Sequence, residues 1–364
     1  CSGYCNRILR VTNKKKRENA RMMKDKILGS IMGAALGDAM GAITETRSAE
    51  RIKEDFGGYI DKLMTPPDDC FAHGYPIGSV TDDFSLAYFT AIELVKAKGN
   101  VTDEVAKQAV LTWSEYPQFF RFAGPTTEAA VRKMKGLDVV KADDGKIDRS
   151  YVAADNCKAT NGSAMKIFAA GLINPGNLDK AVDDTVTICM PTHPNNASIS
   201  GAAAISAAVA KAMEKDATLD QVIEAGIYGA ERGFKIGSEK GARLAVPSVA
   251  KRIKLAAEIG KKGLGWEAEM LELRDIIGAG LMVVEAVPCV FGILAATPGD
   301  PFAAIKMGVN IGDDTDTVAT MVGAIAGALY GVGNMPMEYL YTMEKANKME
   351  LRKLADEVEK EFYA

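Results

Sequence analysis

Apolar residues recur along this chain mostly at the spacing of helices, and alternating strand patterns are scarce. The clearest case starts at Lys26, where "KILGSIMGAALGDAMGAITE" places a glycine at every fourth residue, along one face of a helix. Because glycine has no side chain, that face lets a neighbouring backbone approach closely. A second helix is expected to begin at Thr81 and Asp82 and to end near Gly99. The same periodicity predicts helices at about 102–116, 126–136, 161–173, 178–189, 196–214, 218–232, 275–296, 301–309 and 315–331.

The remaining segments complete the expected architecture. Region 240–275 is charged and amphipathic, so we expect it to lie outside the core, and the heptad-like C-terminal segment is expected to close the surface. No fixed-period repeat and no Pro/Ser-rich linker divides residues 26–364. The sequence therefore predicts one all-α domain at residues 25–364, a compact orthogonal multi-helix bundle. A basic, flexible N-terminal tail at residues 1–24 is expected to precede it.

Composition excludes several classes of function. The net charge of −4 over 364 residues offers no basic surface for nucleic acid. The apolar run 276–297 is long enough to cross a bilayer, but it contains Glu285 and Pro288, so a buried helix is expected and no transmembrane segment. None of the six cysteines forms a CxxC pair, which favours a reducing cytoplasm. The leading Cys-Ser-Gly raises one alternative, a lipid anchor through Cys1. No pattern indicates an oligomeric state.

Two acidic clusters, "TDD" at 81–83 and "DDTDT" at 313–317, each open an apolar helix. Helix capping is the plain interpretation, because Asp and Thr are favoured N-caps and acidic residues suit the first turn. One cap uses only one side chain, however, and two unit charges about 4 Å apart repel by roughly 4 kcal/mol at an effective dielectric of about 20. If the clusters meet, protons or a cation must neutralise them. Aspartate and threonine oxygens suit Mg²⁺, Mn²⁺ or Ca²⁺.

Other acidic motifs fit less well. An EF-hand loop counted from Asp314 would place Ala319 and Ile325 where Gly and Glu are required. "DTDTV" at 314–318 resembles the DxDx[TV] nucleophile of haloacid-dehalogenase phosphatases, with Asp314 as nucleophile, but that motif should end a buried strand. The DDxxD motif of terpene synthases is absent. The two histidines, His73 and His193, are too few for a histidine-rich metal site.

Four signatures in order resemble the ADP-ribosylglycohydrolase family over about residues 27–335. They are "GAALGDAMG" (33–41), "GSVTDDFSLA" (78–87), "NGSAMK" (161–166) and "NIGDDTDTVATMVGAIAGALYG" (310–331), and a Thr-His pair at 192–193 precedes an alanine-rich helix. The resemblance implies an all-α fold with two divalent cations, Mg²⁺ or Mn²⁺, bound where the acidic helices begin. It also implies hydrolysis of an ADP-ribosyl or related ribosyl glycosidic bond, on an ADP-ribosylated protein or a small substrate.

Carried over position by position, the resemblance implies roles for individual residues. It implies that Glu45 acts near the metals and helps to position or activate water. Gly124 and Gly162 would let the backbone approach phosphates. The implied metal ligands are Thr81, Asp82, Asp83, Asp314, Asp316 and Thr317. The implied substrate-binding residues are Asn161, Gly162, Ser163, Met165 and His193, with Gly124.

Four positions depart from the family pattern. Phe84 follows the acidic helix start, Asp313 replaces a glycine, Phe122 stands where some members have aspartate, and Lys166 replaces a common arginine. The first two keep open a second hypothesis, a non-catalytic ADP-ribose-binding or crystallin-like structural member. Three nearby residues are expected to be structural: Asp38 as a hydrogen-bond partner, Trp113 in the core and His73 at the surface.

Overall fold

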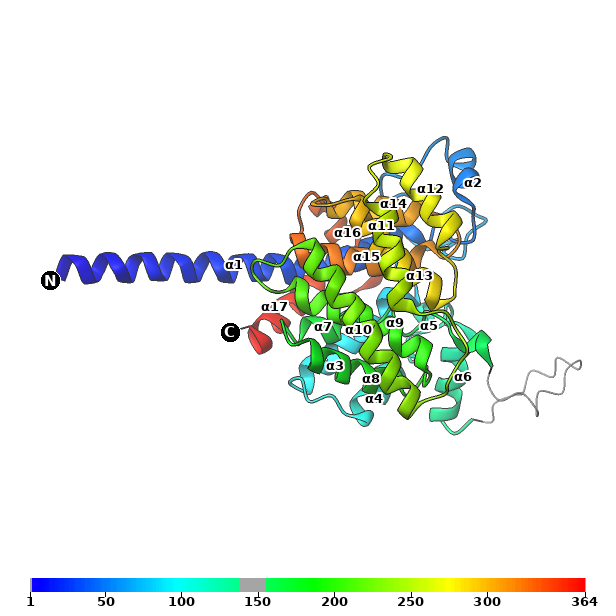
Figure 1. The fold of residues 1–364 in the computed structure, drawn as a ribbon, viewed down its shortest axis with the longest axis horizontal. Helices are drawn as coiled ribbons and strands as arrows, with labels where there is room; N and C mark the ends of the chain where they lie inside the picture. The colour runs from blue at the N-terminus through cyan, green and yellow to red at the C-terminus, as the bar shows by residue number, and fades with distance from the viewer. Residues whose placement is uncertain (1, 138–154, 364) are drawn as a thin grey trace, which may run out of the picture.

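The computed structural model describes residues 2–137 and 155–363, and every regular element in them is helical (Figure 1). Within these ranges there is no β-strand, only isolated bridges. The predicted all-α class is therefore confirmed, whereas Cys1 lies outside the described residues. The helices are α1 Ser2–Gly41, α2 Ala49–Asp55, α3 Asp82–Lys96, α4 Asp103–Trp113, α5 Pro117–Phe120, α6 Pro125–Met134, η1 Asn156–Lys158, α7 Phe168–Leu172, α8 Leu178–Cys189, α9 Asn196–Ala212, α10 Leu219–Lys240, α11 Val249–Gly260, α12 Trp266–Ile276, α13 Val283–Ala296, α14 Pro301–Asn310, α15 Thr315–Tyr330, α16 Met337–Asn347 and α17 Leu351–Phe362.

The centre of the fold is the close antiparallel pair of α1 and α15. The glycine face of α1 meets a matching face of small residues on α15, so that Gly33 lies against the backbone of Gly323 and Gly29 against that of Gly327. A Cβ atom added at any of these positions would overlap main-chain atoms of the partner helix. This packing confirms the predicted close approach and brings the end of α1 to the beginning of α15.

A second layer is built from α9, α10, α11 and α13. The alanine-rich α9 is almost wholly buried and packs along α10, where Gly229 lies against the backbone of Ala203. Helices α11 and α13 also pack together. The expectation that 240–275 lies outside the core is wrong, because Ile253 and Leu273 are fully buried. The helices there are amphipathic, and each buries one apolar face while its charged face stays exposed.

Two predicted helices are interrupted. The expected helix 275–296 is broken between Ile276 and Val283, and only Phe168–Leu172 of 161–173 is helical. The two irregular segments pair with each other, since Val283 N–H donates to the Ala159 carbonyl (2.9 Å) and Asn161 N–H donates to the Leu281 carbonyl (3.0 Å). The pairing holds the 159–167 segment beside the start of α15.

The prediction for the N-terminal segment differs from the structure, whereas the prediction for the C-terminal segment agrees with it. Helix α1 begins at Ser2 and extends beyond the body of the molecule (Figure 1), so the segment expected to be a loose tail is helical there. The division at residue 25 stays a prediction. Helices α16 and α17 pack against α1, with Asp356 of α17 paired to Lys24, and they bury Leu340 and Leu354, as expected for a closing segment. No helix in the described part of the chain has the length and apolarity needed to cross a membrane.

Candidate metal centre and substrate cavity

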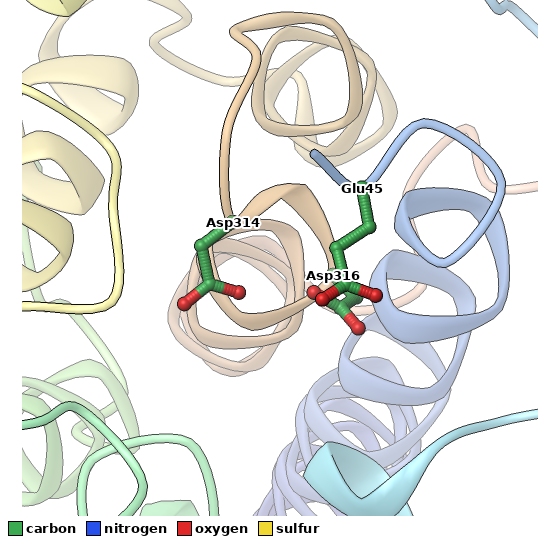
Figure 2. A group of neighbouring side chains, drawn as sticks. All are labelled: Glu45, Asp314 and Asp316. Carbon is green, nitrogen blue, oxygen red and sulfur yellow. The ribbon is translucent and has the colours of Figure 1, made fainter. Parts of the chain in front are cut away.

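Glu45 reaches the acidic start of α15 because two loops pair beside it. Gly41 ends α1 against the backbone of Asp316, and the chain then turns. Thr46 N–H donates to the Asp313 carbonyl (2.8 Å), and Asp313 N–H donates to the Arg47 carbonyl (2.9 Å). One carboxylate oxygen from each of Glu45, Asp314 and Asp316 lies within 4.8 Å of the other two. Figure 2 shows the carboxylates of Glu45 and Asp316 side by side.

The beginning of α3 is held in place by Asp38, a fully buried residue of α1. Its carboxylate accepts hydrogen bonds from the backbone N–H groups of Thr81 (2.9 Å) and Phe84 (2.8 Å). Thr81 is the N-cap, and its hydroxyl oxygen accepts from the backbone N–H of Asp83 (3.3 Å). Asp38 therefore satisfies N–H groups that every helix start leaves without a partner, the structural role that the sequence suggested for it.

The two acidic helix starts face each other, although more than 200 residues separate them. Thr317 in α15 and Asp83 in α3 line the same cavity, and the side chain of Thr317 counteracts the rise in the pKa of Asp83. The charge of Asp314 acts on both Asp82 and Asp83. The 159–167 segment adds a further contact, because Asn161 Nδ2 donates to Asp314 Oδ2 (2.6 Å).

The carboxyl groups in this cluster resist ionisation. Burial, followed by the charges of Asp314 and Asp38, raises the pKa of Glu45 to about 8. Burial raises the pKa of Asp38 to about 7, against the pull of its two N–H donors. Burial and neighbouring carboxylates hold the pKa values of Asp82, Asp83 and Asp316 well above their usual range, and burial also raises that of Asp314. These groups need protons or a cation to neutralise them.

The chemistry of this cluster fits a divalent cation. Asp83 Oδ1 is buried and has no hydrogen-bond partner among the described residues, so a strong acceptor is left free. The surrounding donors are carboxylate and hydroxyl oxygens, the hard ligands that Mg²⁺ and Mn²⁺ prefer. The residues that could hold cations are Glu45, Thr81, Asp82, Asp83, Asp314, Asp316 and Thr317, all of which line one cavity.

That cavity has a volume of about 470 Å³, in the range of small-molecule sites. Its walls include five of the six predicted substrate residues: Gly124, Asn161, Gly162, Met165 and His193. Ser163 is the exception, because it is fully buried and its hydroxyl donates to the Ser198 carbonyl (3.0 Å).

Sequence reasoning missed several further residues of the wall, among them Phe71, Arg121 and Leu281. Leu281 reaches the cavity only because the chain is irregular between α12 and α13. Glycines 278 and 280 were the available signal for that break. Phe71 and Arg121 lie in turn-rich segments whose sequences carry no comparable signal.

A family model described as ADP-ribosylglycohydrolase matches residues 19–364. The chain belongs to the ADP-ribosylglycohydrolase family. It is 28% identical over 341 residues to the uncharacterized protein YegU of Escherichia coli, with 92% of this chain and 96% of that protein covered. It is 25% identical over 338 residues to the ADP-ribosyl-(dinitrogen reductase) glycohydrolase of Rhodospirillum rubrum, with 91% and 95% covered.

Two more comparisons agree with this assignment. The chain is 24% identical over 348 residues to the ADP-ribosylarginine hydrolase Tri1 of Pseudomonas putida, with 92% of this chain and 78% of that protein covered. A solved ADP-ribosylglycohydrolase-related protein complex has the same fold, with a TM-score of 0.63, 20% identity and coverage of 93% and 98%. As a member of the ADP-ribosylglycohydrolase family, the chain is a hydrolase of the glycosidase type.

The departures from the ADP-ribosylglycohydrolase pattern have structural explanations. Phe84 points into the core, where its ring stacks on that of Phe168. Asp313 has a φ of 66°, in the left-handed region that favours glycine and that aspartate tolerates. Its side chain is exposed and does not line the cavity. Phe122 does line it, whereas Lys166 is fully buried behind its wall.

An Asp38→Asn variant should bind Mn²⁺ about 10- to 100-fold more weakly, because second-shell groups that orient ligands have effects of that size. Both carboxylate oxygens of Asp38 accept from the Thr81 N–H, so in either orientation the new amide would place its NH2 group against that N–H, and the start of α3 would shift. Isothermal titration with Mn²⁺ measures the affinity. Asp61→Asn, at an exposed residue outside the cavity, is the control. Unchanged affinity in Asp38→Asn would contradict the positioning role.

Without divalent ions, the folded protein should lose stability as the pH rises from about 6.5 to about 8. Folded Glu45 and Asp38 have raised pKa values of about 8 and about 7, whereas unfolded carboxyls titrate near 4. Their contribution is therefore complete below the unfolded pKa and disappears as the folded groups are forced to ionise. Burial lowers the pKa of His193 to about 3 and that of Lys166 to about 8. Those two shifts act below about 6.5 and above about 8, outside this window.

Urea unfolding in EDTA across this pH range measures the effect. Added Mn²⁺ should raise the stability most at the upper end, because a bound cation favours ionised carboxylates. If the stability in EDTA stays constant or rises with pH between about 6.5 and about 8, the pKa values of the buried carboxyl groups are not raised.

Proposed function

We propose that this chain is a Mg²⁺- or Mn²⁺-dependent hydrolase that cleaves the N- or O-glycosidic bond between an ADP-ribosyl or related ribosyl group and its acceptor. One observation carries the proposal: five carboxylates and two threonines from three separate segments line one end of a cavity of substrate size. Residual negative charge at that end suits paired cations. Bound there, such cations would supply a grip on ribose hydroxyls and lower the pKa of bound water.

The residues divide into three groups. The seven oxygen-bearing residues of the cluster would hold two cations, with Asn161 fixing the orientation of Asp314 through its hydrogen bond. Glu45 would accept a proton from the attacking water as a general base, or stabilise the oxocarbenium character that develops at the glycosidic carbon. Gly162, Met165 and His193, which line the same cavity, would contact the substrate.

The wall also favours a substrate with an anionic part. Arg121 is the one arginine or lysine among the described residues that line the cavity. Its guanidinium lies 5.2 Å from the ring centroid of Tyr75 and 5.3 Å from that of Phe122. Ring stacking leaves the N–H edges of the guanidinium available. A diphosphate, as in ADP-ribose, supplies the acceptor oxygens that such edges bind.

An Arg121→Leu variant should raise KM for an ADP-ribosyl substrate about tenfold, since a hydrogen bond to a charged group contributes about 1.5 kcal/mol or more. KM for a neutral ribosyl nucleoside should not change, if that compound is turned over. Steady-state kinetics on both substrates make the comparison, with Arg51→Leu on the exposed face of α2 as the control. Equal effects on both substrates would contradict a phosphate contact.

The acceptor is proposed from the relatives. The names of two of them describe hydrolysis of ADP-ribosyl groups from arginine and from dinitrogen reductase, so an ADP-ribosylated protein is the proposed natural substrate. The test is hydrolysis of ADP-ribosyl-arginine, ADP-ribosyl-serine and simple ribosyl nucleosides, with Mg²⁺, with Mn²⁺ and with EDTA. We expect release of free ADP-ribose that stops in EDTA. No turnover of any substrate with either metal would overturn the proposal.

Two competing functions lose their support. The crystallin-like alternative was motivated by Phe84 and Asp313, which lie in the core and outside the cavity respectively. The phosphatase alternative needs a strand before Asp314, but α14 precedes it.

The expected cytoplasmic location stays a prediction. The four cysteines whose side chains are described, Cys70, Cys157, Cys189 and Cys289, are free.

A further inference from the structure

A lysine is fully buried behind the cavity wall, with no carboxylate beside it. The ammonium group of Lys166 donates to Thr192 Oγ1 (2.9 Å), and no ion pair of Lys166 exists within the described residues. Burial lowers its pKa to about 8. A buried, unpaired cation is unfavourable for folding, so its presence here calls for an explanation. Its hydrogen bond leads directly to a residue of the cavity.

The direction of these hydrogen bonds follows from the acceptors available to Thr192, because among the described residues its hydroxyl proton has no recorded acceptor except His193 Nδ1. An ammonium group can only donate, so Thr192 Oγ1 accepts from it. The proton of the Thr192 hydroxyl must then point elsewhere, and His193 Nδ1 lies 2.9 Å away. Nδ1 thus accepts, and the ring hydrogen of the neutral imidazole is on Nε2. Burial and the charge of Lys166 lower the pKa of His193 to about 3, which keeps the ring neutral.

The other side of the imidazole faces the substrate cavity. His193 and Gly162 both line it. A Cβ atom on Gly162 would lie 3.0 Å from His193 Nε2 and 3.1 Å from its Cε1, so the ring edge that carries Nε2 stands against the Gly162 backbone. Any other residue at 162 would push the ring edge away. The position of His193 Nε2 is therefore fixed by two segments, the loop before α9 and the 159–167 segment.

We propose that Lys166 is a positioning residue, which acts through Thr192 to hold His193 as the Nε2–H tautomer and so gives the cavity a fixed hydrogen-bond donor. That donor binds an oxygen acceptor of the substrate, a hydroxyl or phosphoryl oxygen, and not a donor group. The inference rests on the proposed function only for the identity of that substrate. The tautomer itself is a property of the protein without ligand.

The tautomer can be observed directly because the chain contains only two histidines. With selectively ¹⁵N-labelled histidine, two-bond ¹H–¹⁵N correlations distinguish the tautomers of His193 from each other and from imidazolium, and exposed His73 provides the reference. The full chain should show His193 as the Nε2–H tautomer alone. A spectrum of the Nδ1–H tautomer or of imidazolium would overturn the proposal.

Two variants test whether the hydrogen-bonded relay of Lys166, Thr192 and His193 sets the tautomer. Lys166→Met removes the donor at similar volume, and Thr192→Val removes the hydroxyl, so one remains informative if the other does not fold. Each should add an Nδ1–H population at His193. The control variants Lys180→Met, at an exposed residue, and Thr187→Val, at a half-buried residue whose hydroxyl donates to the Asp183 carbonyl, should leave the spectrum unchanged. A wild-type spectrum in both relay variants would show that Lys166 does not set the tautomer.

Kinetics add a second readout that separates this inference from the proposed function. KM for an ADP-ribosyl substrate should rise roughly three- to tenfold in Lys166→Met, the size expected for one weakened hydrogen bond, while kcat changes less. A drop in kcat with KM unchanged would contradict a role in substrate binding. If no substrate is hydrolysed at all, the proposed function fails, but the spectra still decide the tautomer.

Discussion

An Asp316→Asn variant should lose both its stabilisation by Mn²⁺ and its hydrolytic activity. Asp316 contributes one of three carboxylates that converge within 4.8 Å, and the amide keeps its shape without its charge. Electrostatic stabilisation by a bound metal is worth several kcal/mol, so kcat should fall about a thousandfold or more. Thermal shift with and without Mn²⁺ and hydrolysis of an ADP-ribosyl substrate measure the two effects.

The neighbouring carboxylate provides the control for this variant. Asp313 is exposed, does not line the cavity and has a left-handed φ that asparagine also adopts readily. Asp313→Asn should therefore keep the Mn²⁺ shift and most of the activity. In EDTA, Asp316→Asn should be at least as stable as wild type, because it removes a buried group whose ionisation is unfavourable beside Glu45 and Asp83. A normal Mn²⁺ shift in Asp316→Asn would mean that Asp316 is not an important ligand.

The second large effect concerns the fold. Gly33→Ala should lower the free energy of unfolding by about 3 kcal/mol or more, at the upper end of what overpacking costs. The new Cβ would overlap the carbonyl of Gly323, and two helix backbones cannot relieve this by changing a rotamer. Alanine is intrinsically better than glycine in a helix by about 1 kcal/mol, so helix propensity alone predicts the opposite sign. Urea unfolding in EDTA measures the difference without any contribution from metal.

Gly124→Ala is the matched glycine substitution. Gly124 has a φ of −64°, and a Cβ there meets no atom within 4 Å, so we expect a change of about 1 kcal/mol or less. Gly33→Ala should also weaken Mn²⁺ binding, since a wider separation of α1 and α15 moves Glu45 away from Asp316. A variant as stable as wild type would show that the helices can separate at little cost.

Local patterns account for the part of the fold that could be predicted. Helix α8 spans Leu178–Cys189 and α15 spans Thr315–Tyr330, against expected ranges of 178–189 and 315–331. Helix α8 has apolar periodicity and α15 is a continuous apolar run of helical length, and the caps and glycines that delimit both are recognised within a few residues of sequence. The interruption before Val283 was missed because the prediction relied on hydropathy. By that measure the run 275–296 is continuous, although Gly278 and Gly280 lie inside it.

The candidate site divides in the same way. The oxygen-rich residue types and their crowding at two helix starts are visible in the sequence, and they already indicate a need for neutralising charge. Arg121 and the hydrogen bonds of Lys166 with Thr192 carry no sequence pattern. Their roles depend on which groups lie around them after folding, and burial decides the ionisation of each one.

The sequence by itself determined that the chain is helical, that a glycine face demands a close helix neighbour, and that two helices begin with clustered carboxylates. Only the tertiary structure decided that these two helix starts line one cavity, that Glu45 lies beside Asp316, and that His193 is backed by a buried lysine. The physical reason is the range of the interactions. Helix formation and capping act over a few residues, whereas a cavity arises from contacts between segments that lie hundreds of residues apart.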